Sequence, residues 1–277
     1  MNIKLIALDL DGTLLDTDHA TIPQRNVDAL RAAAERGVDL AIASGRSWSL
    51  IREIAQALGP VRYGITANGA YVLDVATGQA VGQTGMDVGQ CARIIRILRR
   101  YDLPYELYID GDNYVERNDL NRLGDYALSQ DFLEMFSRHM TVVDDMLKAL
   151  DRGVPEKFNL FWQPEAPGDK VALMSDLEAT GPLFFAGALG SNLEFNADGV
   201  SKGKALADLC THLGYSCDEV MAFGDADNDL EMLSWAGWSF AMENGSDAVK
   251  EAATYLAPPN SAAGVGQMVE RYVLGRS

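Results

Sequence analysis

The feature that most constrains this chain is a series of short apolar segments separated by segments with helical patterning. Residues 3–8, 38–43 and 63–67 are mostly apolar, as is typical of strands buried on both faces of a sheet. Residues 22–36 and 47–58 have the apolar spacing of helices, and a glycine follows each of them. Strands that alternate with helices predict βαβ units, so we expect an α/β fold with a doubly wound, Rossmann-like parallel sheet.

The middle of the chain has a different pattern. We predict a helix at residues 88–101 and a strand hairpin at 105–117 that turns at the Asp-Gly-Asp-Asn segment 110–113. A mostly helical, polar stretch follows, and then a strand, a helix and a strand at 157–163, 169–180 and 183–187. Hairpins mixed with helices are typical of an α+β module rather than of further βαβ units.

After about residue 190 the alternating pattern returns. The predicted helices are 202–213, 227–235, 246–253 and 264–274, and the predicted strands are 219–223 and 238–242. A chain of 277 residues has room for about two domains. We therefore expect a discontinuous core domain, residues 1–82 and 192–277, with an α+β domain inserted at residues 83–191.

The charge of the chain limits its partners. The formal net charge of −17 argues against binding to nucleic acid or to anionic membrane surfaces, because both need a basic face. It does not exclude a phosphorylated small molecule, because a local site can be positive or hold a metal ion. Three cysteines give no disulfide framework, and no apolar run is long enough for a membrane span or a signal peptide. We expect a cytoplasmic protein, and the composition leaves its oligomeric state open.

Two acidic segments follow predicted buried strands. Asp9, Asp11, Gly12 and Thr13 come directly after the first strand. Carboxylates beside a core are costly unless they hold a metal or do chemistry, although Asp-Gly also occurs in ordinary solvated turns. In an open α/β sheet ligands bind outside the carboxyl ends of the strands, which makes this a candidate site.

The second acidic segment is Gly224-Asp225-Ala226-Asp227-Asn228-Asp229, which follows the strand predicted at 219–223. A helix N-terminus would account for Asp227 alone, but not for three aspartates and an asparagine together. An EF-hand is excluded because Leu230 and Ala236 stand where its loop needs glycine and glutamate. A parallel sheet would place both acidic segments on the same rim.

Two further segments are suited to binding phosphate. Ser44-Gly45-Arg46 leads from the second strand into a helix, where a hydroxyl and backbone N–H groups form an anion site, although Ser44 could also be an ordinary N-cap. Ser201 and Lys202 precede another helix, and Lys202 can supply positive charge beside a phosphate. This is not a P-loop, because Gly-x-x-x-x-Gly-Lys-Ser/Thr is absent.

Together these four segments resemble the four motifs of the haloacid dehalogenase (HAD) superfamily, in the same order and spacing. The inserted middle resembles the type IIB (C2B) cap of the Cof-like phosphatases. The segment Asn68-Gly69-Ala70 and residues 237–252, with Asn244, also resemble that subfamily. The resemblance extends over the whole chain. It implies a phosphatase that hydrolyses phosphate monoesters of small metabolites, such as sugar phosphates, with Mg²⁺ and an aspartyl-phosphate intermediate.

The resemblance also implies a role for each motif residue. Asp9 is the expected nucleophile and Asp11 the general acid and base. Mg²⁺ is expected to bind Asp9, the backbone carbonyl of Asp11, and Asp225. The other expected contacts are with phosphate or the outer metal shell, from Ser44, Lys202, Thr13, Gly45, Asn228 and Asp229, and with the rest of the substrate, from Arg46, Asn68 and Gly69.

The charges favour a metal. Two unit charges ~4 Å apart interact by ~4 kcal/mol at an effective dielectric of ~20, so a phosphate facing several aspartates is repelled without a cation.

In the inserted domain Tyr105, Tyr108 and Trp162 are candidates for substrate contacts, although packing inside the domain is the commoner role of such aromatics. His19 has no partner at metal-ligand spacing. Two alternative functions stay open, a sugar phosphomutase similar to phosphomannomutase and a non-catalytic sensor of a phosphorylated ligand.

Overall fold

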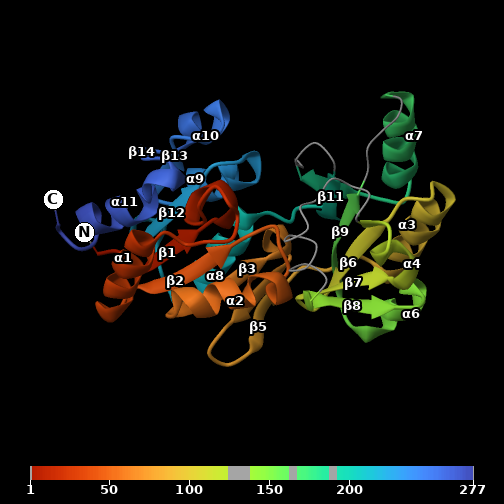
Figure 1. The fold of residues 1–277 in the computed structure, drawn as a ribbon, viewed down its shortest axis with the longest axis horizontal. Coiled ribbons are helices and arrows are strands. Elements are labelled where there is room, and N and C mark those ends of the chain that lie inside the picture. Colours follow the sequence, from red (N-terminus) through yellow and green to blue (C-terminus); the bar gives the residue numbers. More distant parts are fainter. Residues whose placement is uncertain (1, 124–137, 162–166, 187–191, 277) are drawn as a thin grey trace. The chain divides into compact units, whose positions relative to one another are not determined.

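The structure is a computed structural model that describes residues 2–123, 138–161, 167–186 and 192–276. The chain divides into two compact units (Figure 1). Unit 1 comprises Met1–Arg46, Ile51–Gln83 and Ser201–Ser277, and unit 2 comprises Ser47–Leu50 and Thr84–Val200. The chain thus leaves unit 1 and returns to it, so that segments far apart in the sequence build one sheet.

Unit 1 contains an eight-stranded sheet in the order β14-β13-β12-β1-β2-β3-β4-β5. Its strands β14 to β3 are parallel, and β4 and β5 extend it as an antiparallel hairpin. The strands are β1 (Leu5–Leu8), β2 (Asp39–Ala43), β3 (Val61–Thr66), β4 (Tyr71–Asp74), β5 (Gln79–Gln83), β12 (Val220–Gly224), β13 (Trp238–Met242) and β14 (Tyr255–Ala257). The doubly wound parallel core predicted from the alternating pattern is confirmed, and the β4–β5 extension was missed.

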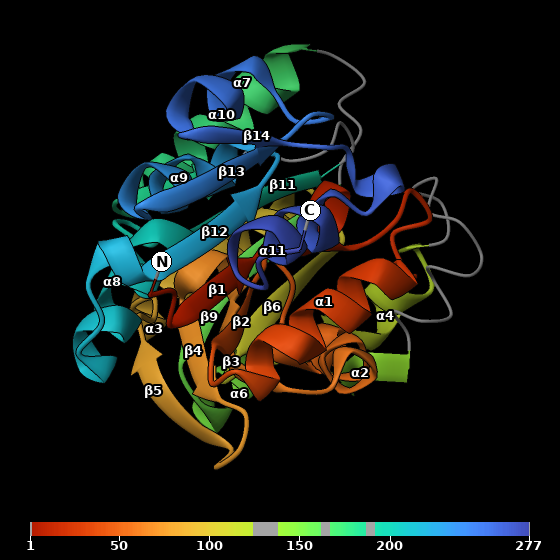
Figure 2. The same ribbon diagram turned by 90° about the vertical axis from the view of Figure 1, so that its left-hand side faces the viewer.

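Helices cover both faces of this sheet. The helices are α1 (Gln24–Glu35), α2 (Trp48–Leu58), α8 (Lys202–Leu213), α9 (Leu230–Trp235), α10 (Asp247–Ala252) and α11 (Gly264–Tyr272). Side chains of α8, α9 and α10 pack with Leu5, Ala7 and other strand residues in one apolar cluster. Helices α1 and α11 lie side by side on the other face (Figure 2). The central strand β1 is therefore fully buried.

The strand order changes direction at β1. From β1 the chain runs outward through β2 and β3, and it later returns to build β12, β13 and β14 on the other side of β1. The adjacent strands β1 and β12 are parallel and pair Leu8 with Phe223. Their carboxyl ends therefore meet at a topological switch point, where ligands bind in open α/β sheets.

Unit 2 contains a six-stranded sheet in the order β10-β11-β9-β6-β7-β8, antiparallel except for β7 and β8. Its strands are β6 (Tyr105–Ile109), β7 (Asp112–Glu116), β8 (Met140–Val143), β9 (Pro155–Phe161), β10 (Leu183–Ala186) and β11 (Asn192–Ala197). Its helices are α3 (Val88–Arg100), α4 (Arg117–Leu120), α6 (Met146–Ala149) and α7 (Pro167–Glu178). The predicted hairpin is confirmed as β6 and β7, and the second sheet is mixed as an α+β module requires.

Two strands of unit 2 differ from the prediction. β8 lies in the stretch expected to be mostly helical, and β11 was not predicted. β11 pairs with both β9 and β10, so unit 2 continues to Val200, past the expected boundary at 191. In β11 the apolar residues Leu193, Phe195 and Ala197 pack in the core and alternate with polar residues, so this strand is not a continuous apolar run.

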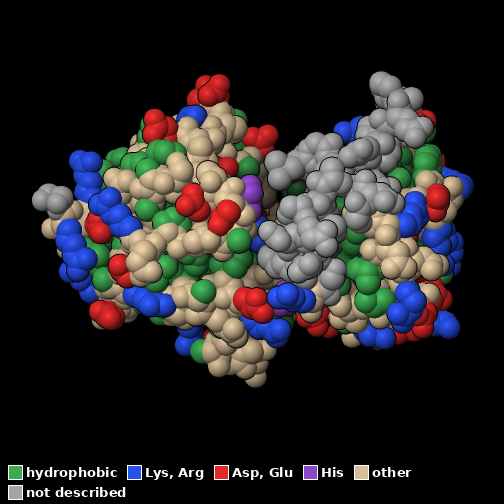
Figure 3. All heavy atoms as spheres, viewed as in Figure 1, with side chains coloured by type: hydrophobic (Ala, Val, Ile, Leu, Met, Phe, Trp, Pro, Cys, Tyr) green, Lys and Arg blue, Asp and Glu red, His purple; other side chains and the backbone are tan. Residues whose placement is uncertain are grey.

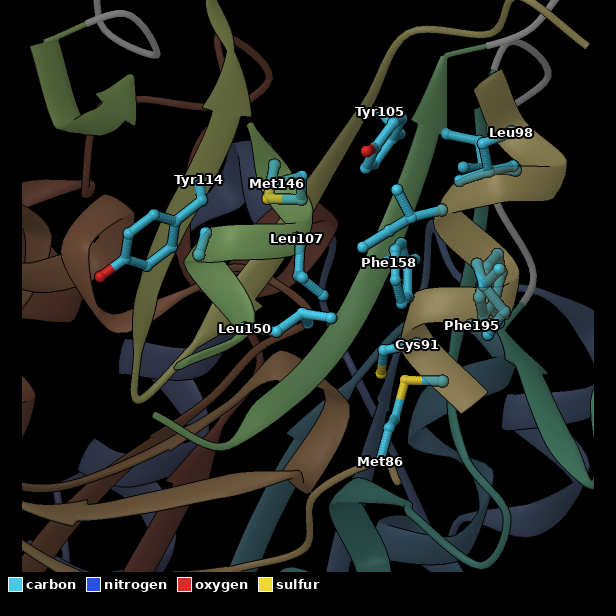
Figure 4. Close-up of a cluster of buried hydrophobic side chains, with 14 of the residues drawn as sticks. Met86, Cys91, Leu98, Tyr105, Leu107, Tyr114, Met146, Leu150, Phe158 and Phe195 are labelled. Atoms are coloured by element: carbon cyan, nitrogen blue, oxygen red, sulfur yellow. The ribbon is translucent and has the colours of Figure 1, made fainter. Parts of the chain in front are cut away.

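One candidate substrate residue lies inside the core of unit 2. Tyr105 packs with Leu107 and Phe158 against α3 (Figure 4) and is 1% exposed. It is therefore a packing residue, because its ring is enclosed by apolar side chains. Tyr108 is also buried, with the Lys157 ammonium 5.1 Å from its ring centre. Trp162 lies outside the described residues.

Two features relate to binding of nucleic acid or membranes: the distribution of charged side chains on the surface, and the length and polarity of the helices. On the face shown in Figure 3, basic side chains lie among acidic ones and form no continuous basic patch over the described residues. Oppositely charged side chains also form ion pairs, such as Arg99 with Glu116. Within the described ranges, the helices are all too short or too polar to cross a bilayer.

Candidate active site

The two acidic segments meet at the switch point between β1 and β12. Asp9 follows β1, and its backbone N–H donates to the carbonyl of Phe223 in β12 over 3.1 Å. Asp225 follows β12 directly. One carboxylate oxygen from each of Asp9, Asp225 and Asp229 lies within 4.8 Å of the others. The parallel pairing of the strands thus brings together aspartates that are more than two hundred residues apart in the chain.

The turn after β1 depends on Gly12. Its φ angle of +78° lies in the left-handed region, and a Cβ atom there would overlap the carboxylate of Asp225. The Gly12 carbonyl accepts a hydrogen bond from Asn244 Nδ2 over 2.8 Å. The next residue, Thr13, donates from Oγ1 to Asp225 Oδ1 over 3.0 Å. Glycine is therefore needed for both its conformation and its lack of a side chain.

Lys202 lies between two of the carboxylates. Its ammonium Nζ is 2.6 Å from Asp9 Oδ1 and 2.8 Å from Asp229 Oδ1. Lys202 is the first residue of α8 and is 1% exposed, and Ser201 caps this helix by accepting from the backbone N–H of Lys204 over 3.1 Å. A buried ammonium requires such partners, because an uncompensated buried charge is strongly unfavourable.

The electrostatics of this group leave an excess of negative charge. Burial, together with the Asp229 carboxylate, raises the pKa of Asp9 well above its usual value. The same two causes raise the pKa of Asp225 to about 6. Burial alone would lower the pKa of Lys202, but the carboxylates of Asp229 and Asp9 raise it. Three carboxylates face one ammonium, which is the setting in which a cation binds.

The donor atoms fit a hard divalent cation, since carboxylate oxygens are the ligands that Mg²⁺ and Ca²⁺ prefer. Asp229 is already engaged, because its Oδ1 pairs with Lys202 and its Oδ2 accepts from the backbone N–H groups of Asp225 and Ala226 over 3.0 and 3.1 Å. Asp9 and Asp225 have fewer such bonds. The acidic group is thus consistent with a metal site.

A second wall of the site comes from the segments after β2 and β3. Ser44 is buried at the end of β2, and its Oγ accepts from the backbone N–H of Arg46 over 3.2 Å; Gly45 lies between them. Asn68 has a φ angle of +59°, and its Oδ1 accepts from Asn228 Nδ2 over 3.3 Å. At Gly69 a Cβ atom would overlap the backbone carbonyl of Ser201. The segment at Asn68 and Gly69 thus contacts the second acidic segment and the segment before α8, and the backbone N–H of Asn68 donates to the Ser44 carbonyl over 3.1 Å.

The Asp11 side chain does not share the partners of Asp9, Asp225 and Asp229, and it contacts Arg46 and His19 instead. Arg46 binds its carboxylate with two donors, Nη2 to Oδ1 over 2.5 Å and Nε to Oδ2 over 2.9 Å. His19 Nδ1 lies 3.1 Å from Asp11 Oδ1. Burial alone would raise the pKa of Asp11, but the contacts with His19 and Arg46 lower it overall. His19 is not among the predicted site residues, because spacing along the chain carries no signal of this contact.

Comparisons with known proteins extend over nearly the whole chain. The haloacid dehalogenase-like hydrolase family matches residues 6–269. The 5-amino-6-(5-phospho-D-ribitylamino)uracil phosphatase YcsE of Bacillus subtilis is 28% identical over 274 residues, which cover 99% of this chain and 97% of that protein. The pyridoxal phosphate phosphatase YbhA of Escherichia coli is 26% identical over 278 residues, which cover 99% and 100%.

Solved structures agree with this match. A haloacid dehalogenase-like hydrolase from Bacteroides thetaiotaomicron has a TM-score of 0.83 and 25% identity, covering 97% of this chain and 99% of that one. The HAD subclass IIB sugar phosphatase BT4131 has the same fold, with a TM-score of 0.77 and 20% identity, covering 98% and 99%. The resemblance inferred from the motifs is confirmed: this chain is an enzyme of the haloacid dehalogenase-like hydrolase family, whose curated relatives are phosphatases.

Proposed function

We propose that this protein hydrolyses phosphate monoesters of small metabolites, with Mg²⁺ as cofactor and Asp9 as nucleophile. The observation that carries the proposal is the buried group in which Lys202 bridges Asp9 and Asp229 while Asp225 lies beside them. Such a group combines a nucleophile, a fixed positive charge and metal ligands at one strand end. A protein that only bound a phosphorylated ligand would not need the nucleophile.

In the first step, an Asp9 carboxylate oxygen attacks phosphorus, and the bond between phosphorus and the ester oxygen breaks. Asp11, which carries the proton that it took from water in the preceding turnover, gives this proton to the departing oxygen, so the products are an alcohol and an aspartyl phosphate. In the second step, a water oxygen attacks the same phosphorus, Asp11 takes a proton from that water, and the bond to Asp9 breaks. Inorganic phosphate leaves, and both aspartates return to their starting state.

The remaining residues bind and orient. Lys202 and Ser44, with the backbone of Gly45, are suited to hold phosphoryl oxygens. Asp9, Asp225 and the Asp11 carbonyl would hold Mg²⁺, which when bound neutralises charge on the phosphoryl oxygens. Asp229 fixes Lys202, Thr13 fixes Asp225, and Asn228 fixes Asn68. Arg46, Asn68 and Gly69 would lie nearest the leaving group, and we assign the inserted part of unit 2, Thr84–Val200, to a cap of the C2B type.

The substrate class follows from the relatives. Their names specify a ribityl phosphate compound and pyridoxal phosphate, both small phosphorylated metabolites. We place the substrate of this chain in the same class, as a phosphate monoester of a small polar molecule. The negative net charge is compatible with this class, because the positive charge needed is local.

The test is a phosphate-release screen over phosphorylated metabolites with Mg²⁺, using Asp9→Asn as the blank. We expect release by the wild type, loss of at least about 10³-fold in Asp9→Asn, and no change in Asp208→Asn, which removes an exposed carboxylate on α8. Wild-type turnover in Asp9→Asn would exclude Asp9 as nucleophile. Isomerisation of a sugar phosphate without free phosphate would indicate a mutase instead.

A further inference from the structure

The loop that follows the first motif is a closed, hydrogen-bonded turn. The backbone N–H of Asp16 donates to the Thr21 carbonyl over 2.8 Å, and the N–H of His19 donates to the Asp16 carbonyl over 3.0 Å. The Asp18 carboxylate accepts three hydrogen bonds, from the backbone N–H groups of Ala20 and Thr21 and from Thr21 Oγ1. These bonds are made within six consecutive residues, so the loop holds its own shape.

The turn places His19 in an unusual backbone conformation. Its φ angle is +56°, which lies in the left-handed region that a residue with a side chain seldom adopts. The conformation directs the imidazole back toward Asp11, eight residues earlier, with Nδ1 3.1 Å from Oδ1. His19 is 54% exposed at its side chain, so apolar burial does not explain why the loop holds it there.

The hydrogen bonds that the Asp11 carboxylate receives from the described residues leave one lone pair of Oδ2 without a donor. A carboxylate has about four lone-pair positions. Oδ1 receives two donors, His19 Nδ1 and Arg46 Nη2, and Oδ2 receives one, Arg46 Nε. Among the described residues no donor takes the second lone pair of Oδ2. The Arg46 guanidinium also reaches the His19 carbonyl over 3.4 Å, which ties the loop to the same cluster.

We propose that His19 is a positioning residue, which acts with Arg46 to orient Asp11 so that proton transfer takes place at Oδ2. This inference rests on the proposed phosphatase function. The proton on Oδ2 passes to the ester oxygen as the bond between phosphorus and that oxygen breaks. A proton from water then returns to Oδ2 as the water oxygen bonds to phosphorus and the bond to Asp9 breaks.

The need for such positioning follows from the exposure of Asp11. Its side chain is 36% exposed, so without partners the carboxylate would rotate freely in contact with water. A misplacement of about 1 Å can cost about 10²-fold in rate. The hydrogen bond from His19 does not require a cationic ring, because Nδ1 carries a proton in the imidazolium and in one neutral tautomer.

The test compares leaving groups that differ in their need for a proton. A nitrophenolate leaves without one, whereas the alkoxide of glycerol phosphate needs one. In single-turnover rapid-quench experiments with the His19→Gly variant, phosphorylation of Asp9 by glycerol phosphate is expected to slow about 10–100-fold. Phosphorylation by p-nitrophenyl phosphate is expected to change less than about 3-fold, and breakdown of the phosphoenzyme is expected to slow equally after either substrate.

Matched variants separate positioning from other effects. His19→Asn keeps an N–H donor near the place of Nδ1 and tolerates the left-handed backbone, so it is expected to restore most of the lost rate. His212→Asn removes an exposed histidine on α8 and is expected to behave as the wild type. In an Asp11→Asn background, His19→Gly is expected to have no further effect, because the carboxylate it orients is gone.

Three results would overturn the inference: equal slowing of phosphorylation by both substrates, no slowing by either, or a full effect of His19→Gly in the Asp11→Asn background. If the proposed function is wrong, the wild type will form no phosphoenzyme with p-nitrophenyl phosphate. This wild-type experiment is done first and needs no variant. Thermal unfolding of each variant accompanies the kinetics and shows whether the variant is folded at the assay temperature.

Discussion

Lys202 and Gly12 show how single residues decide the charge and the space of this site. Lys202 is buried between Asp9 and Asp229, and its charge compensates part of theirs. Gly12 leaves the room that the Asp225 carboxylate occupies. The motif pattern predicted both residues, because Asp-Gly and Ser-Lys are local signals. It could not predict the His19 and Arg46 contacts on Asp11, which arise from a left-handed backbone and from tertiary packing.

The first prediction compares two glycines that have the same backbone conformation. Gly12 and Gly37 have φ angles of +78° and +86°, but a Cβ atom at Gly37 has nothing within 4 Å. Gly37→Ala is expected to lower the free energy of unfolding by about 1–2 kcal/mol through backbone strain, and Gly12→Ala by more, because its Cβ atom also overlaps the Asp225 carboxylate. Only Gly12→Ala is expected to lower turnover, by about 10²-fold, because it displaces Asp225.

Chemical denaturation and phosphate release measure the two effects. The interpretation is wrong if Gly12→Ala keeps full turnover, or if Gly37→Ala loses as much activity as Gly12→Ala does. The Gly37 variant serves as the control for strain, since it lies at the end of α1 and its added methyl group meets open space.

At the scale of elements, local signals predicted most of unit 1 and less of unit 2. The bounds of α8 match the prediction because Ser201 caps its start and Gly214, in a left-handed conformation, ends it. The η6 turn at Asp227–Asp229 and α9 together form the helix expected at 227–235. β11 was missed although its apolar residues alternate with polar ones, and β8 was missed because Met140–Val143 is a short segment within a stretch that is otherwise polar and helical in pattern.

The second prediction concerns the helix cap that precedes Lys202. Ser201→Ala removes the acceptor for the Lys204 N–H, and Asp87→Ala removes the equivalent acceptor for the Gln90 N–H at the start of α3. Each is expected to lower the free energy of unfolding by about 1 kcal/mol. Only Ser201→Ala is expected to raise the KM for the phosphate ester, because fraying of the first turn of α8 moves Lys202.

Urea denaturation and steady-state kinetics on the three proteins test this pair. Asp87 is the matched control, since it caps a helix of unit 2 with the same hydrogen bond and is separate from the acidic group. An unchanged KM in Ser201→Ala, at a confirmed loss of stability, would contradict the link between the cap and Lys202.

At the scale of the whole molecule, the raised pKa of Asp225 makes the free energy of unfolding of the metal-free protein depend on pH. Burial and the neighbouring Asp229 raise the pKa of Asp225 to about 6, against about 3.9 in an unfolded chain. Between these values the unfolded chain releases the proton while the folded chain keeps it. The contribution of Asp225 to the free energy of unfolding therefore falls as pH rises from about 4 to about 6 and stays low above that range.

The third prediction follows from this sign. In a chelator at pH 7.5, Asp225→Asn is expected to melt at a higher temperature than the wild type, and the difference is expected to vanish near pH 4. Added Mg²⁺ is expected to raise the melting temperature of the wild type, with a stabilisation of about 2.7 kcal/mol at a hundred times its dissociation constant, and to raise that of Asp225→Asn much less.

Thermal unfolding from pH 4 to pH 8 provides the measurement, with Asp208→Asn as the control for loss of an exposed carboxylate. A wild type that is more stable than Asp225→Asn in chelator at pH 7.5 would contradict the excess negative charge inferred for the acidic group. Equal stabilisation of both proteins by Mg²⁺ would exclude Asp225 as a ligand.

The pairing of β1 with β12 also governs when this molecule can become an enzyme during synthesis. The two strands are adjacent in the sheet, yet the whole of unit 2 lies between them in the chain. The first motif leaves the ribosome early and β1 can pair with β2, but its neighbour on the other side, β12, is complete only when Gly224 has emerged. Catalytic competence must therefore arrive late, whereas unit 2 can collapse around its own sheet before β12 is synthesised.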